Sequence, residues 1–189
     1  MATTNYTRVT ALAQHMMSGY LNRGDIVIDA TMGNGYDTLF LSNMVGEEGK
    51  VLAFDIQTVA LDKTRNLLEE NQCPGNVTLI HDGHENMDKY VLGDVKGIMF
   101  NLGYLPGGNH QLPTKAQSTL RSLEKAIELL RVKGIITIVI YPGHPEGILE
   151  MEEILTYARN LNHCSYHVLK IDYINQLNNA PLILAIVKK

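Results

Sequence analysis

The sequence contains no tryptophan, three phenylalanines and two cysteines among its 189 residues. The core must therefore be built mainly from Leu, Ile, Val and Met. Cys73 and Cys164 match no metal or redox spacing, so we expect two reduced thiols rather than a disulfide. No stretch approaches the ~18 consecutive apolar residues of a membrane span. The N-terminal residues also contain no apolar run of signal-peptide length. We therefore expect a soluble, cytoplasmic protein.

An excess of basic residues is also missing. Sixteen Lys and Arg residues stand against twenty Asp and Glu residues, which gives a formal net charge of −4. This balance argues against a protein coated with positive charge for generic nucleic-acid binding. Basic residues are locally dense around one expected helix, and a solvated helix surface is the favoured interpretation of them. They are Lys115, Arg121, Lys125, Arg131 and Lys133.

Strand-like and helix-like stretches alternate along the whole chain. Apolar periodicity and turn residues predict helices over 9–20, 58–71, 84–90, 115–130 and 146–161, and one more between Leu39 and Val45. Short apolar runs predict strands over 26–28, 51–54, 77–80, 95–100, 135–140, 166–173 and 182–187. No linker or repeat divides the chain, so we expect residues 1–189 to form one domain.

The order of these elements predicts an α/β fold. Continuous apolar strands that alternate with helices are typical of a parallel sheet covered on both faces. The last two strands are joined by residues 175–181 only, which are too few for a crossover helix, so they must form a hairpin. We expect a mostly parallel seven-stranded sheet with a C-terminal antiparallel hairpin, the Rossmann-like arrangement of class I methyltransferases.

A glycine-rich turn directly follows the first expected strand, with the sequence Asp29-Ala30-Thr31-Met32-Gly33-Asn34-Gly35. Glycines let the backbone approach a ligand closely. A nicotinamide-binding loop would have a third glycine where this chain has Thr38. Acids at Asp29 and Asp37 also suit no pyrophosphate. An acid that begins the loop suits a ligand with an ammonium group, such as the methionyl end of S-adenosylmethionine.

Two further acids stand at the ends of the next two strands. Asp55 follows the second strand, where a carboxylate can accept hydrogen bonds from ribose hydroxyls, and Asp82 follows the third, where it can meet an adenine amino group. The alternative is that each acid only caps a turn. Three acids in register favour a ligand-binding crevice at the carboxyl ends of the strands. His81 and His84 lack metal-ligand spacing, so we expect no metal site.

The fourth strand runs into the loop Asn101-Leu102-Gly103-Tyr104-Leu105-Pro106-Gly107-Gly108. This loop resembles the Asn/Asp-Pro-Pro-Tyr/Phe signature of amino-group methyltransferases, in which the Asn orients an amine and the aromatic ring stacks on a base. The alternative is a Gly/Pro-rich turn without chemistry. The amine must also lose a proton, and Asp29, Asp37 and His144 are all open candidates. His144 can equally be punctuation at the start of a helix.

Several motifs together resemble one family, the bacterial tRNA 5-(aminomethyl)-2-thiouridine methyltransferases, long labelled rRNA methylases. The matching stretches are DATMGNGYDTLF from Asp29, Asp55-Ile56-Gln57, HDGH from His81, FNLGYLPGG from Phe100 and YPGHP from Tyr141. The resemblance implies methyl transfer from S-adenosylmethionine to the aminomethyl nitrogen of the wobble uridine, in the anticodon loop of tRNA. Where the family has Cys and His, this chain has Met32 and Tyr36.

These motifs yield two sets of candidate residues. The residues that we assign to S-adenosylmethionine are Asp29, Thr31, Gly33, Asn34, Gly35, Asp37, Asp55, Gln57, Asp82, Gly83, His84 and Asn101. The residues that we assign to the reaction are Asn101, Tyr104 and His144.

Two other functions remain open from the sequence. A methyltransferase for rRNA or for a small amine fits the same motifs, because the pI is acidic and no added RNA-binding domain is visible. A non-catalytic nucleotide-binding module fits the same crevice, although it has no need of the loop after Asn101. Apolar residues on the exposed faces also allow a homodimer.

Overall fold

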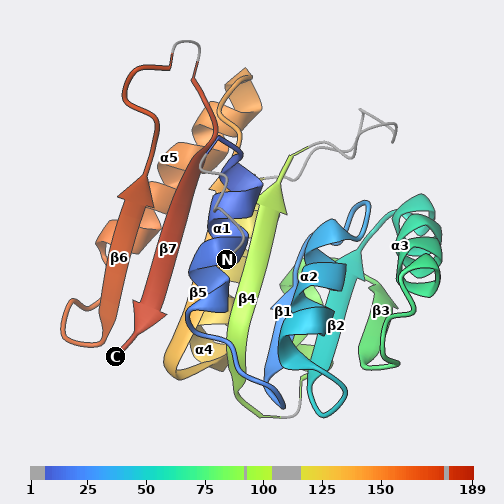
Figure 1. The fold of residues 1–189 in the computed structure, drawn as a ribbon. Helices are drawn as coiled ribbons and strands as arrows, with labels where there is room; N and C mark the ends of the chain where they lie inside the picture. Colours follow the sequence, from blue (N-terminus) through green and yellow to red (C-terminus); the bar gives the residue numbers. More distant parts are fainter. Residues whose placement is uncertain (1–6, 92, 104–115, 177–178) are drawn as a thin grey trace.

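The seven strands in the described part of the chain lie in one sheet (Figure 1). The computed structural model describes residues 7–91, 93–103, 116–176 and 179–189. Across the sheet the strand order is β3-β2-β1-β4-β5-β7-β6. Their bounds are β1 Ile26–Asp29, β2 Lys50–Asp55, β3 Val77–His81, β4 Val95–Leu102, β5 Leu130–Ile140, β6 Tyr166–Ile171 and β7 Leu182–Lys188.

The expected sheet topology is confirmed. Neighbouring strands from β3 to β5 pair in parallel, whereas β7 pairs antiparallel with both β5 and β6. The last strand of the chain thus inserts between β5 and β6, and β6 forms the edge of the sheet (Figure 1). The short connection between β6 and β7 predicts their hairpin, but it does not predict that β7 inserts between β5 and β6.

Helices cover both faces of the sheet. On one face lie α1 Val9–Ser18, α2 Tyr36–Val45 and α3 Thr58–Glu70 (Figure 1). The other face carries the 3₁₀ helix η1 His84–Lys89, with α4 Ala116–Leu129 and α5 Pro145–Arg159. Among the described helices, none combines the length and the apolar character that a membrane crossing requires.

The apolar core has one layer on each side of the sheet. The larger layer packs strand residues such as Phe54 and Phe100 against η1, α4 and α5. The other layer packs Val27 and Met99 against Ala13 and Met17 of α1 and against α2. Each layer consists largely of Leu, Ile, Val, Ala and Met, as the absence of tryptophan led us to expect.

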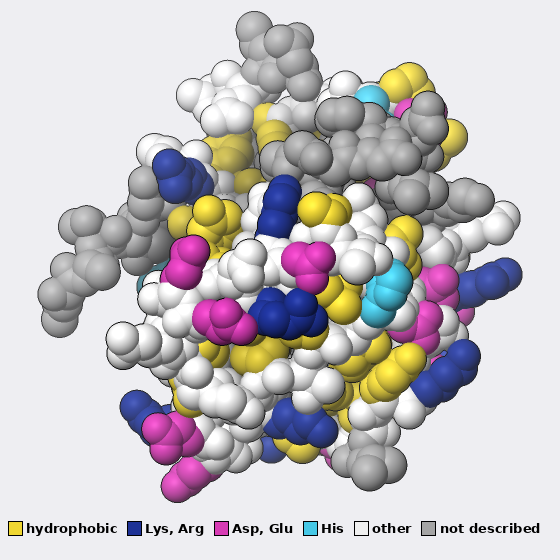
Figure 2. All heavy atoms as spheres, turned by 90° about the vertical axis from the view of Figure 1, so that its right-hand side faces the viewer, with side chains coloured by type: hydrophobic (Ala, Val, Ile, Leu, Met, Phe, Trp, Pro, Cys, Tyr) yellow, Lys and Arg dark blue, Asp and Glu magenta, His cyan; other side chains and the backbone are white. Residues whose placement is uncertain are grey.

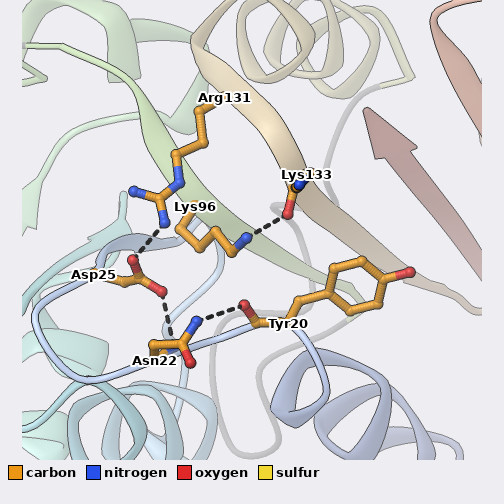
Figure 3. A network of polar contacts seen from close by, with 6 residues as sticks. All are labelled: Tyr20, Asn22, Asp25, Lys96, Arg131 and Lys133. Carbon is orange, nitrogen blue, oxygen red and sulfur yellow. Dashed lines mark hydrogen bonds and ion pairs between the residues drawn. The ribbon is translucent and has the colours of Figure 1, made fainter. Parts of the chain in front are cut away.

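Strand β5 begins five residues earlier than the apolar run at 135–140 predicts. Lys133 has φ 60°, and the pairing of β4 with β5 shifts between Val95 and Gly97. The Lys133-Gly134 pair therefore makes an irregularity within the strand rather than a turn before it. The side chain of Lys96 donates a hydrogen bond to the Lys133 carbonyl and holds this irregular backbone (Figure 3).

Two of the basic residues around α4 are engaged in ion pairs. Arg131 contacts the buried carboxylate of Asp25 at 2.7 Å (Figure 3), and Lys125 contacts Asp88 at 3.3 Å. On the face over α3 and β3, acidic and basic side chains are interspersed (Figure 2). The partly exposed pair of Lys125 and Asp88 agrees with the solvated-surface interpretation, whereas Arg131 pairs with a buried acid. Cys73 and Cys164 are both free, as expected.

Candidate cofactor and methyl-transfer site

The candidate site lies where the strand order reverses. The chain passes from β1 to β2 on one side, whereas β4 lies on the other side of β1. Ligands of open α/β sheets bind at this switch point, beyond the carboxyl ends of the strands. Asp29 ends β1, Asp55 ends β2 and Asn101 lies at the end of β4, so the fold brings three of the predicted residues to this edge.

Asp29 is buried, and each of its carboxylate oxygens accepts a hydrogen bond. Its side chain is 1% exposed. One oxygen accepts from the backbone N–H of Thr31 at 3.1 Å, and the other accepts from the Thr38 hydroxyl at 2.6 Å. Thr38 stands where a nicotinamide-binding loop has its third glycine. In this chain the Thr38 hydroxyl instead holds the Asp29 carboxylate. Burial, followed by the charge of Asp37, raises the pKa of Asp29 to about 7.

The glycine loop adopts the backbone conformations that its sequence predicts. Gly33 has φ 52° and Gly35 has φ 85°, which side chains disfavour. A Cβ atom at Gly35 would also lie 2.9 Å from the Thr64 hydroxyl on α3. The side chain of Asn34 accepts a hydrogen bond from Lys63 at 3.2 Å. The tight turn between β1 and α2 thus depends on glycine at both positions.

Asp55 is linked directly to this loop. One carboxylate oxygen accepts from the backbone N–H of Gly33 at 3.0 Å, and the other accepts from that of Gln57 at 2.9 Å. The carboxylate therefore sets the position of the glycine loop relative to β2. Burial raises its pKa above the ordinary value.

Asp82 and His84, which the sequence analysis assigns to the cofactor, make local structural contacts after β3. Asp82 accepts from the backbone N–H of Gly83 at 2.7 Å, from Asn86 at 2.9 Å and from the Tyr90 hydroxyl at 2.8 Å, and these hydrogen bonds lower its pKa. His84 is buried, and its Nδ1 lies 3.0 Å from the Ala30 carbonyl. Burial lowers the pKa of His84. Because a carbonyl oxygen can only accept, the Nδ1 of His84 must carry a proton and donate this hydrogen bond.

Both the backbone and the side chain of Asn101 make polar contacts. Its backbone N–H donates to the hydroxyl of Thr31 at 2.7 Å, and its side-chain Nδ2 lies 3.4 Å from Asp37 Oδ2. Because Nδ2 faces Asp37, the amide oxygen is left for another donor. Tyr104, the predicted stacking residue, lies outside the described residues.

His144 caps the start of α5. Its Nδ1 accepts a hydrogen bond from the backbone N–H of Gly147 at 3.0 Å, and Pro145 occupies the first helical turn. The same nitrogen lies 3.3 Å from a carboxylate oxygen of Glu146. The helix-start interpretation of His144 is thus confirmed, and its part in the reaction stays a prediction.

Two residues at this site were given no role from the sequence, although one of them, Tyr141, opens the YPGHP motif. Gln14 of α1 donates to Asp37 Oδ1 at 2.6 Å, although it lies 23 residues before Asp37. Tyr141, which follows β5, is partly buried, and burial together with the charge of Asp37 raises its pKa. A glutamine on an amphipathic helix carries no local signal of such a contact, because only the packing of α1 on the sheet creates it.

The buried carboxylates of this site fit S-adenosylmethionine. In the described part of the chain, no Lys or Arg forms an ion pair with Asp29, Asp37 or Asp55. Buried carboxylates without a cation favour a positively charged ligand. The sulfonium and ammonium groups of this cofactor are positive, and its ribose hydroxyls can donate to Asp55. A phosphate-bearing cofactor would instead meet repulsion.

Comparison with known proteins identifies the family. The sequence model of the family described as "Putative rRNA methylase" matches residues 51–187. The chain belongs to this family. A model of the protein-L-isoaspartate(D-aspartate) O-methyltransferases also matches residues 2–91, which include the glycine loop and β2.

Relatives with names or structures agree with this assignment. The chloroplastic tRNA (mnm(5)s(2)U34)-methyltransferase of Arabidopsis thaliana is 35% identical, over 96% of this chain and 70% of the plant protein. A "putative rRNA-methylase" of Clostridium thermocellum has a TM-score of 0.94 and 42% identity, over 98% of this chain and 100% of that one. A "putative methyltransferase" of Streptococcus mutans in complex with SAH has a TM-score of 0.88 and 38% identity, over 96% and 98%.

The protein is therefore a methyltransferase of class I fold that uses S-adenosylmethionine. The expected fold, enzyme class and cofactor are all confirmed. The assignment of individual residues to the cofactor stays a prediction, which the contacts of Asp29 and Asp55 support.

Replacement of Asp29 by Asn should stabilise the protein at alkaline pH. The pKa of Asp29 is raised from 3.8 to about 7, so the folded state binds more protons than the unfolded state between these values. The free energy of unfolding of the unaltered protein therefore falls as the pH rises through this range. Asparagine avoids this loss, and we expect a gain on the order of 4 kcal/mol at pH 8 that shrinks towards pH 4.

Urea denaturation of both proteins at several pH values measures this gain. The matched control is Asp62→Asn on the exposed surface of α3, which should show no such pH-dependent gain. A difference between Asp29→Asn and the unaltered protein that stays constant with pH would contradict the raised pKa.

Proposed function

We propose that the protein methylates the aminomethyl nitrogen of the wobble uridine in tRNA, giving the methylaminomethyl form. The plant relative, named for this uridine, supports the proposal across 96% of the chain. The structural observation that carries it is the position of Asn101 at the switch point. Its amide is oriented by Asp37 and its backbone is held by Thr31.

The uncharged side chain of Asn101 would orient the substrate amine. With Nδ2 directed at Asp37, the amide oxygen can accept an N–H of the substrate amine and direct its lone pair towards the methyl donor. S-adenosylmethionine, when bound, supplies an electrophilic methyl group on a sulfonium. Asp29 and Asp55 lie on the side of the site that faces β2 and would hold the cofactor.

The anticodon loop is the part of tRNA that the site would receive. Single-stranded loops are bound through unstacked bases and a small number of aromatic and polar contacts, which does not require a strongly basic protein. The Tyr104 ring would supply such a stacking contact. A homodimer, a cytoplasmic location and the single-domain organisation of residues 1–189 stay predictions.

Transfer of labelled methyl groups distinguishes the substrates. We expect label from S-adenosylmethionine to appear in tRNA that carries the aminomethyl-thiouridine, and not in tRNA without that modification or in rRNA. The Asn101→Ala variant serves as the inactive control. Label in rRNA alone would contradict the proposal and favour the alternative substrate.

A further inference from the structure

Gln14 projects from α1 into the candidate site. The helix is anchored on the sheet by Ala13 and Met17, both 0% exposed. From the intervening position, Gln14 Nε2 donates to Asp37 Oδ1 at 2.6 Å. The other oxygen of Asp37 faces the amide of Asn101. The three side chains thus form a chain of contacts from α1 to the end of β4.

Asp37 lies in an environment that disfavours its charge. It is 8% exposed, and burial raises its pKa. The titratable groups that face it are Asp29, whose pKa its charge raises, and Tyr141 after β5. The hydrogen bonds from Gln14 and Asn101 act in the opposite direction and lower its pKa. Gln14 makes the shorter of the two contacts.

Of the three candidate proton acceptors, Asp37 alone contacts Asn101 in the described part of the chain. Asp29 is 1% exposed, and the partners of its two carboxylate oxygens among the described residues are Thr31 and Thr38 rather than Asn101. The Nδ1 of His144 is engaged in capping α5. The group beside the amine-orienting amide is therefore the carboxylate that Gln14 holds.

We propose that Asp37 accepts the proton of the substrate ammonium group, and that Gln14 is a positioning residue that keeps this carboxylate ionised and aimed at Asn101. The inference rests on the function proposed above. The ammonium nitrogen gives one proton to Asp37, which becomes a carboxylic acid. The lone pair left on nitrogen then forms the bond to the methyl carbon. The carbon–sulfur bond breaks at the same time, and the electron pair of that bond stays on sulfur. Asp37 afterwards returns its proton to water.

Two substitutions at Gln14 should move the pH profile in opposite directions. Gln14→Met removes the donor at nearly constant length, so the acidic limb of kcat/KM for tRNA should move to higher pH by about one unit. Gln14→Lys places an ammonium group beside Asp37, so the same limb should move to lower pH. The titration of the tRNA amine is common to all the proteins compared, so a shift of the acidic limb reports a group of the enzyme.

A merely structural role of Gln14 would lower activity in both variants and leave the limb in place, which would overturn the inference. Gln176→Met, the same change at an exposed residue beyond β6, should leave the profile unchanged. The carboxyl ¹³C resonance of Asp37 gives a second measurement that needs no substrate, and its midpoint should move in the same two directions. An unmoved midpoint in both variants would also overturn the inference.

Failure of the two proposals can be told apart. If the unaltered protein transfers no methyl group to modified tRNA, the proposed function is wrong and the role of Gln14 in that reaction falls with it. If the unaltered protein methylates tRNA and neither Gln14 variant moves the acidic limb, only the inference about Gln14 and Asp37 is wrong.

Discussion

Asn101→Ala is expected to lower kcat for methyl transfer by about 100-fold or more, while the Kd for S-adenosylmethionine changes by less than about threefold. The amide side chain orients the amine, and loss of this orientation affects the reacting geometry rather than cofactor binding. The backbone contact of Asn101 with Thr31 does not involve the side chain and should persist. Single-turnover kinetics and calorimetric titration of the cofactor measure the two quantities.

Asn71→Ala is the matched control for this experiment. Asn71 follows α3, and its amide donates to a backbone carbonyl away from the site. This variant should keep the kcat of the unaltered protein. An undiminished kcat in Asn101→Ala would show that the amide does not orient the amine, whereas a large loss of cofactor affinity would place Asn101 in the cofactor site instead.

Asp55→Ala is expected to weaken cofactor binding more than it lowers kcat. The carboxylate holds Gly33 of the glycine loop and would accept the ribose hydroxyls, so its loss should raise the Kd for S-adenosylmethionine by about 10–100-fold. At saturating cofactor, kcat should fall by less than about fivefold, because the residue does not touch the amine.

Asp55→Asn refines the interpretation of this result. Asparagine keeps one acceptor oxygen and the shape of the side chain, so its effect on Kd should be intermediate. Asp62→Ala on the exposed surface of α3 is the control. An unchanged Kd in Asp55→Ala would refute the ribose contact and leave Asp55 with only its role in positioning the glycine loop.

Local patterns in the sequence predict most of the fold. The apolar runs place the seven described strands, and they are most evident where a parallel strand is buried, as in β1 and β2. The start of β5 is missed since Lys133-Gly134 has the composition of a turn, and only the pairing with β4 turns it into a strand irregularity. The insertion of β7 between β5 and β6 is likewise decided by packing across the sheet.

The candidate site is predicted less completely. Asp29, Asp55 and Asn101 are found because strand ends converge at one edge of a parallel sheet. The contact of Gln14 with Asp37 joins residues on different elements, and nothing in either local sequence indicates it. The same holds for His84, which the structure places against the Ala30 carbonyl after β1.

The most direct test of the account is mass spectrometry of nucleosides from aminomethyl-thiouridine tRNA, after incubation with this protein and S-adenosylmethionine. We expect this one nucleoside to gain a single methyl group, and the Asn101→Ala protein to form about 100-fold less of the product in the same time. A methyl group on any other nucleoside, or none on this one while the cofactor still binds, would contradict the assignment of the wobble-uridine amine as the acceptor.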